Sequence, residues 1–228
     1  IEIFNDLIDR SRQIHDLERR LQGNRALAEV IIESHLLDDK NVDRSNVDIA
    51  LSMLIDAIQA GRDNGLGQDV ATQCLLSNIH VLQRNYDRAE KAIDIANASY
   101  NNQPIMQDRM NLNLARARLE ATRNNFGGAF DHLNETVEIL EKMEGRWWQA
   151  RIWLEMGNLY LRRNEPEDVD QGQNLFRESL AEFKDMGVTY YPDLIIDKLR
   201  QVKHVSRAQA IAHKKITQEL AEAGRVQN

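Results

Sequence analysis

Three stretches of this chain align with one another at a constant spacing of 40 residues. In each stretch, apolar or small residues recur at positions i, i+4, i+7 and i+11, which places them on one face of an α-helix. The middle residue is small in all three copies, so a second helix can approach closely there. The three stripes are Val70, Cys74, Ser77 and Val81; Met110, Leu114, Ala117 and Ala121; and Ala150, Leu154, Gly157 and Leu161. This period predicts stacked helical hairpins, which are usually binding surfaces rather than catalysts.

The composition favours an all-α fold. Charged residues make up 29% of the chain and hydrophobic residues 42%, with only three prolines. No alternating apolar–polar run bounded by turn residues predicts a strand, and no apolar run is long enough to predict a membrane span. The net charge of −7 argues against a general nucleic-acid-binding surface. A single cysteine, Cys74, fits a reducing, cytoplasmic setting.

Three regions are expected along the chain. An N-terminal connector helix covers residues 1–22, a helical repeat domain covers 24–203, and a C-terminal linker helix covers 204–228. Gly23 and Asn24 are expected to end the first helix. Both terminal helices carry narrow, heptad-like stripes, which predict a homodimer formed through at least one of them. Within the repeat domain, helices are expected over residues 24–38, 45–62, 68–84, 86–100, 104–123, 126–143, 146–163, 168–186 and 192–202.

The second helix of each pair carries the pattern aromatic-x-x-Ala-x-x-x-apolar-x-x-small. Its two clearest copies are Tyr86, Ala89, Ile93 and Ala96, and Phe126, Ala129, Leu133 and Thr136. This pattern resembles the tetratricopeptide repeat over about residues 24–190, although the period is 40 residues instead of the usual 34. The resemblance implies a right-handed superhelical array of antiparallel helix pairs, an α-solenoid. It also implies that Tyr86 and Phe126 are buried at the turns between paired helices.

The resemblance further implies that the first helices of the pairs line a concave groove. Arginine and asparagine donors in such a groove suit a peptide carboxylate or an acidic segment. The alternative interpretation is a solvated face of exposed helices. The groove residues carried over onto this register are Asn78, Asn111, Arg118, Arg151, Asn158 and Arg162.

Trp147 and Trp148 lie side by side at the expected start of a helix. Two indoles seldom hide completely at such a position. They are expected either to pack against the preceding hairpin or to form a hot spot for a protein partner.

No catalytic, cofactor or metal site is expected. The six histidines show no metal-ligand spacing with cysteine or carboxylate residues. Gly61, Gly65 and Gly67 follow no strand and precede no Gly-Lys-Ser/Thr, so they indicate a turn rather than a phosphate loop. The chain is therefore expected to be a non-enzymatic, protein- or peptide-binding module that neither requires a cofactor nor enters a membrane.

The C-terminal segment, residues 216–228, resembles the helix that leads into SpoIIE-type serine phosphatases of bacterial stress-response regulators. This resemblance implies a bacterial signalling protein in which the repeat array passes a signal to a C-terminal effector, with a serine phosphatase as the candidate. The alternative is a tetratricopeptide-like scaffold, or the sensor arm of a transcriptional regulator. In that case the basic segment 198–215 would meet nucleic acid, whereas a solvated helix and linker is the simpler interpretation of that segment.

Overall fold

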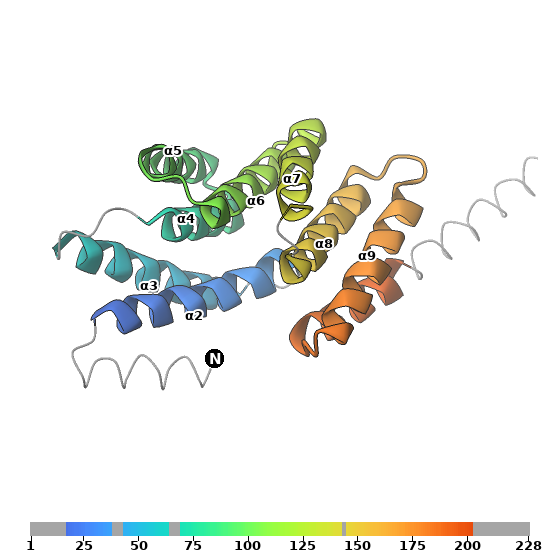
Figure 1. Cartoon of the computed structure of the whole chain (residues 1–228), viewed down its shortest axis with the longest axis horizontal. Helices are drawn as coiled ribbons and strands as arrows, with labels where there is room; N and C mark the ends of the chain where they lie inside the picture. Colours follow the sequence, from blue (N-terminus) through green and yellow to red (C-terminus); the bar gives the residue numbers. More distant parts are fainter. Residues whose placement is uncertain (1–16, 38–42, 64–68, 143–144, 203–228) are drawn as a thin grey trace, which may run out of the picture. The chain divides into compact units, whose positions relative to one another are not determined.

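The computed structural model describes residues 17–37, 43–63, 69–142 and 145–202, and α-helices are the only regular elements in these ranges (Figure 1). The chain divides into two compact units, residues 1–144 and residues 145–228. The expected repeat domain, 24–203, therefore extends over both units, which are described separately below. None of the described helices is both long enough and apolar enough to cross a membrane.

Unit 1 consists of three helical hairpins. Each hairpin joins two helices that pack on one another, and the first helix of the middle hairpin also packs on the first helices of the other two. The hairpins are α2 (Leu17–Leu37) with α3 (Arg44–Asp63), α4 (Val70–Leu82) with α5 (Tyr86–Asn102), and α6 (Met106–Thr122) with α7 (Phe126–Leu140). Helix α4 is therefore the central element of this unit.

Unit 2 is built on one helical hairpin. Helices α8 (Arg146–Arg163) and α9 (Asp168–Asp185) pack along one another, and a further helical stretch covers residues 190–202. Phe176 and Phe183 of α9 are fully buried, together with Ile152 and Leu154 of α8. Ile195 carries the helical stretch 190–202 into the same apolar interior.

The 40-residue stripes form the buried faces of α4, α6 and α8, as predicted. Every stripe residue is buried except Leu161, which is half-buried at the end of α8. In unit 1, the stripe of α4 contributes Val70, Cys74 and Val81 to one core, with Leu112 of α6 and Ile93 of α5. Burial also raises the pKa of the Cys74 thiol, so this side chain behaves as a small apolar core residue.

The period also appears in the backbone at the ends of α4, α6 and α8. Arg84, Asn124 and Asn164 have φ angles of 59°, 60° and 56°, which is the left-handed conformation, and they lie 40 residues apart. After α4, the backbone N–H of Asn85 donates to the carbonyl of His80 at 2.8 Å, and after α6, that of Asn125 donates to Glu120 at 3.0 Å. This six-residue closure satisfies the last carbonyls of a helix and turns the chain sharply. The 40-residue period therefore appears in the backbone conformation as well as in the pattern of side chains.

The small middle position of the stripe permits the closest helix approach in unit 2. A methyl group added at Gly157 would lie 2.6 Å from Cε1 of Phe176, and one added at Gly172 would lie 3.1 Å from the carbonyl oxygen of Gly157. Because both glycines lack a Cβ, α8 and α9 approach backbone to backbone at this crossing. Ser77 and Ala117, the equivalent residues of α4 and α6, are also buried.

Two expectations about local structure are wrong. Helix α2 runs without a break through Gly23 and Asn24, so these residues do not end a helix. Tyr86 and Phe126 begin α5 and α7, but both are half-buried rather than buried, because the first turn of each helix stays open to solvent on one side. The superhelical course and its handedness stay predictions. Most of the N-terminal connector (1–16) and the C-terminal linker helix (204–228) lie outside the described residues.

Candidate functional site

In unit 1 the predicted groove residues lie on α4 and α6, and two of them are buried. Asn78 is 4% exposed and Arg118 is 7% exposed, and the two occupy equivalent positions in the repeat. Asn111, about two turns further toward the start of α6, is half-buried. These positions are therefore more enclosed than the solvated face that was the alternative interpretation.

Arg118 forms an ion pair with Glu33 of α2. Nη1 of Arg118 lies 3.1 Å from Oε1 of Glu33, and Nη2 lies 3.4 Å from Oε2, so both arms of the guanidinium face both carboxylate oxygens. Only 6% of the Glu33 side chain is exposed. The Nη2 contact is a hydrogen bond and the Nη1 contact is a close ion pair, a charge-assisted combination that suits recognition of a carboxylate by arginine. Sequence reasoning missed Glu33 because the 40-residue stripe of first helices was identified only in α4, α6 and α8, so α2 had no position in the repeat.

Buried amide side chains line the same two helices. Gln73 is 2% exposed and Asn113 is not exposed at all, and these two positions are again 40 residues apart. Among the described residues, Asn113 makes no hydrogen bond through either its amide nitrogen or its amide oxygen, and Oδ1 of Asn78 and Oε1 of Gln73 also have no donor. Burying amides in this way is costly unless they meet a partner. We refer to Gln73, Asn78 and Asn113 as the buried amide set.

In unit 2 the predicted groove residues differ widely in exposure. Arg151 is only 1% exposed, its guanidinium carbon lies 5.8 Å above the ring of Trp147, and its Nη2 is 3.9 Å from Glu155. Asn158 is half-buried, and Arg162 is exposed at the end of α8. Arg162 is therefore the most solvent-exposed of the predicted groove residues.

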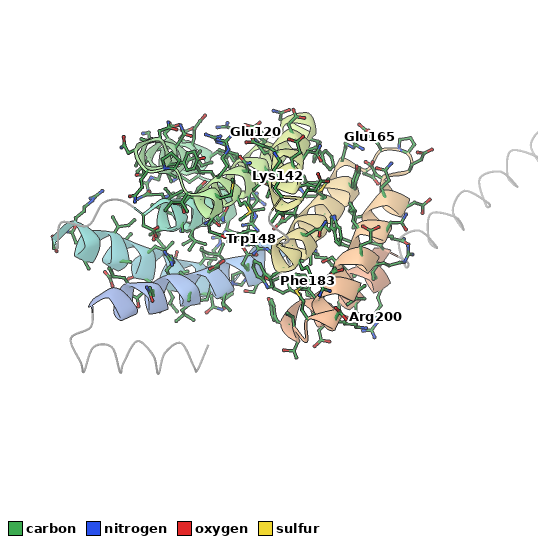
Figure 2. All side chains as sticks on the ribbon, in the orientation of Figure 1. Glu120, Lys142, Trp148, Glu165, Phe183 and Arg200 are labelled. Carbon is green, nitrogen blue, oxygen red and sulfur yellow. The ribbon has the colours of Figure 1, made fainter. Side chains whose placement is uncertain are left out.

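The tryptophan pair belongs to a larger aromatic cluster within unit 2, where Figure 2 labels Trp148 on α8 and Phe183 on α9. Trp147 meets Trp148 edge to face at 5.2 Å between ring centroids, and it meets Tyr191 at 6.3 Å. Tyr191 also stacks on Phe183 at 4.5 Å and contacts Tyr190 at 5.4 Å. We define the aromatic cluster as Trp147, Trp148, Phe183, Tyr190 and Tyr191.

The aromatic cluster combines a buried base with an accessible edge. Phe183 is fully buried, both indoles are half-buried, and Tyr190 is 48% exposed. Arg146, at the start of α8, forms ion pairs with Glu182 and Asp185 at the end of α9. These ion pairs join the N-terminal end of α8 to the C-terminal end of α9. Tryptophan, tyrosine and arginine are the residues most enriched in protein-binding hot spots. Sequence reasoning identified the two indoles but missed Phe183, Tyr190 and Tyr191. Tyr191 contacts Trp147 and Phe183 only because the chain turns back after α9.

The described residues contain no group of three or more histidine, cysteine, aspartate or glutamate side chains placed to hold a metal ion. The turn between α8 and α9 contains Glu165 and Glu167 and is followed by Asp168, which an arginine of α8 holds in an ion pair. Arg163 donates from Nε and Nη2 to the two carboxylate oxygens of Asp168, at 3.0 and 2.6 Å, and lowers the pKa of that carboxyl.

The sequence matches no protein-family model. A search of curated proteins likewise returns no relative. Solved structures do match, among them the crystal structure of BtubC (BKLC) from P. vanneervenii, with a TM-score of 0.53 and 15% sequence identity over 90% of each chain. At this identity the likeness concerns the fold alone, and it agrees with an all-α array of helix pairs.

Proposed function

We propose that this chain is a non-enzymatic regulatory module that binds an acidic segment of a protein or peptide. In this proposal the array is a long-period, tetratricopeptide-like solenoid whose first helices carry the binding residues. The 40-residue repetition of buried stripes and left-handed turns supports the proposal, because solenoids of stacked hairpins generally serve as binding surfaces.

The observation that carries the proposal is the burial of two arginines in first helices of the repeat. Arg118 is 7% exposed beside Glu33, and Arg151 is 1% exposed near Glu155. A buried ion pair contributes little to stability compared with well-packed apolar residues of similar size. Packing alone therefore favours apolar residues at these positions, whereas recognition of a carboxylate favours guanidinium groups.

We further propose that the module belongs to a bacterial signalling protein and passes the bound state to a C-terminal effector, with a serine phosphatase as the candidate. The residues behind this part of the proposal, 216–228, lie outside the described ranges. Pairing of terminal helices between two copies of the chain would give such a module a way to transmit a shift or twist.

A peptide-binding measurement tests the proposal. Two pools of fluorescein-labelled random dodecapeptides, one rich in Asp and Glu and one rich in Lys, are titrated with the protein and followed by fluorescence anisotropy. We expect the acidic pool to bind and the basic pool not to bind. Added salt should weaken the binding, because exposed charges are screened.

The variant for this assay is Arg162→Glu, because Arg162 is exposed. Arg177→Glu is the matched control, since Arg177 is an exposed arginine of α9 that bonds only its own helix neighbours Gln173 and Asn174 among the contacts described. We expect Arg162→Glu to weaken binding about tenfold, equivalent to about 1.4 kcal/mol, and Arg177→Glu to leave it unchanged. Equal effects of the two variants, or equal binding of both pools, would refute the proposed function.

A further inference from the structure

Glu33 and Arg118 join two helices that do not form one of the main packed pairs of unit 1. Helix α2 packs on α3 and α4, and α6 packs on α4, α5 and α7. The ion pair nevertheless links residues 85 positions apart in the sequence. The Arg118 guanidinium therefore meets a carboxylate from the first hairpin, through one hydrogen bond and one close ion-pair contact, and a ligand carboxylate could make the same contacts.

The buried amide set lies on α6, which carries Arg118, and on α4, which packs against both α2 and α6. Asn78 is the repeat equivalent of Arg118, and Asn113 lies on α6 five residues before it. These side chains are more than nine-tenths buried, and each has an amide oxygen without a donor among the described residues; Asn113 also has an amide nitrogen without an acceptor there. Peptide groups, which offer one donor and one acceptor each, match this set. A carboxylate-binding arginine together with such amides is the donor and acceptor set that an acidic peptide requires.

From these observations we propose that Glu33 is a built-in competitor, which occupies on Arg118 the position of a carboxylate from an acidic peptide ligand. This inference rests on the proposed function and adds a means of regulation to it. Binding exchanges one carboxylate for another, so the affinity for a ligand is set by how readily α2 gives up its contact with Arg118. Any event that displaces α2 then opens the site.

The test uses three fluorescein-labelled peptides and the full chain. Hexaglutamate with a free C-terminus, hexaglutamate with an amidated C-terminus, and a Gly-Ser hexapeptide with a free C-terminus separate side-chain carboxylates from a terminal one. The proteins compared are the wild type, Glu33→Gln, and Glu33→Gln combined with Arg118→Gln. Glu90→Gln is the matched control, because it makes the same charge change at an exposed Glu–Arg pair of the same unit, Glu90 with Arg123 at 2.8 Å.

We expect Glu33→Gln to bind hexaglutamate about tenfold to a hundredfold more tightly than the wild type, which is the scale of a hydrogen-bonded contact with a charged group. Glu90→Gln should leave the affinity unchanged, and adding Arg118→Gln should abolish the gain. A gain that persists with the amidated peptide assigns the ligand carboxylate to side chains. A gain for the Gly-Ser peptide assigns it to the C-terminus.

Unchanged affinity in a folded Glu33→Gln protein overturns the inference. If Arg162→Glu still weakens binding of the acidic pool in that case, the proposed function stands without the competitor. Absence of binding by every protein overturns both. Folding of unit 1 is checked by helical circular dichroism and by protection of Cys74 from a thiol reagent, because Cys74 is buried in α4. If Glu33→Gln does not fold, Glu33→Asp replaces it in the assay. Aspartate retracts the carboxylate from Arg118 by one methylene, so Glu33→Asp should bind hexaglutamate more tightly than the wild type, by a smaller factor than that expected for Glu33→Gln. Unchanged affinity in Glu33→Asp would overturn the inference.

Discussion

The contact between Gly157 and Phe176 gives the most demanding test of the repeat packing. In a Gly157→Ala variant the new methyl carbon would lie 2.6 Å from Cε1 and 2.7 Å from Cδ1 of Phe176, and 3.2 Å from the carbonyl oxygen of Gly172. The ring is fully buried and the oxygen belongs to the backbone, so neither can move away cheaply. Overpacking of this kind costs about 1–3 kcal/mol. We take a value near 3 kcal/mol, because both neighbours are fixed.

Alanine in place of glycine also favours a helix by about 1 kcal/mol. The net expectation for Gly157→Ala is therefore a loss of about 2 kcal/mol in the free energy of unfolding of unit 2. Gly127→Ala is the matched control, because a methyl group at this helical glycine of α7 meets no atom within 4 Å. The same substitution should there stabilise the fold, by about 0.5–1 kcal/mol.

The assay is unfolding by urea, followed by tryptophan fluorescence for Gly157→Ala and by circular dichroism for Gly127→Ala, because Gly127 lies in unit 1. The three tryptophans, Trp147, Trp148 and Trp153, all lie in α8, so the signal reports on unit 2. A loss of about 2 kcal/mol should lower the urea midpoint by about 1 M. Replacing Phe176 by leucine should make room for the methyl group, so Gly157→Ala should cost less in that background. An unchanged or raised midpoint for Gly157→Ala in the wild-type background would refute the close approach of α8 and α9.

Three further predictions follow from the turns. Phe126→Ala should cost about 2 kcal/mol, roughly half the cost at a fully buried site, because Phe126 is half-buried; circular dichroism during urea unfolding measures it. Arg84→Asn should stabilise unit 1 by about 1 kcal/mol, since Arg84 has the left-handed conformation that Asn tolerates better, and an unchanged urea midpoint would contradict this. Arg163 lowers the pKa of Asp168 below 3.8, so the ionised Asp168 carboxylate stabilises the folded state of unit 2. This stabilisation is fully present above the unfolded-state pKa of Asp168 and is lost as the pH falls through its folded-state pKa. Asp168→Asn should lower the urea midpoint of unit 2 at pH 7 and flatten its decline below about pH 4.

The sequence predicts the helix pairs well because their information is local and periodic. Residues such as Met110, Leu114 and Ala117 recur at helical spacing, so the buried face follows from the pattern without knowledge of the neighbouring helices. The extent to which a residue at a helix start is covered, in contrast, depends on other segments. Phe126 illustrates this: it begins α7 as the aromatic pattern predicts, but it is only half-buried.

The candidate site depends mainly on contacts between distant residues. The pattern singles out Arg118, but its partner Glu33 comes from α2, a helix outside the three copies of the 40-residue stripe. Trp147 and Trp148 stand out in the sequence, whereas Phe183 and Tyr191 reach them only because the chain turns back after α9. Long-range pairings of this kind leave no periodic trace in a single sequence.

Hydrogen exchange measured by mass spectrometry, with and without the acidic peptide pool, tests the central claim most directly. The proposal is that acidic segments bind to the first helices of the hairpins within each unit, through residues such as Arg118 in unit 1 and Arg162 in unit 2. The account predicts slower exchange of backbone amides in α4, α6 and α8 when the acidic pool is present, and no change with the basic pool. Protection confined to α5, α7 and α9, or no protection at all, would contradict it.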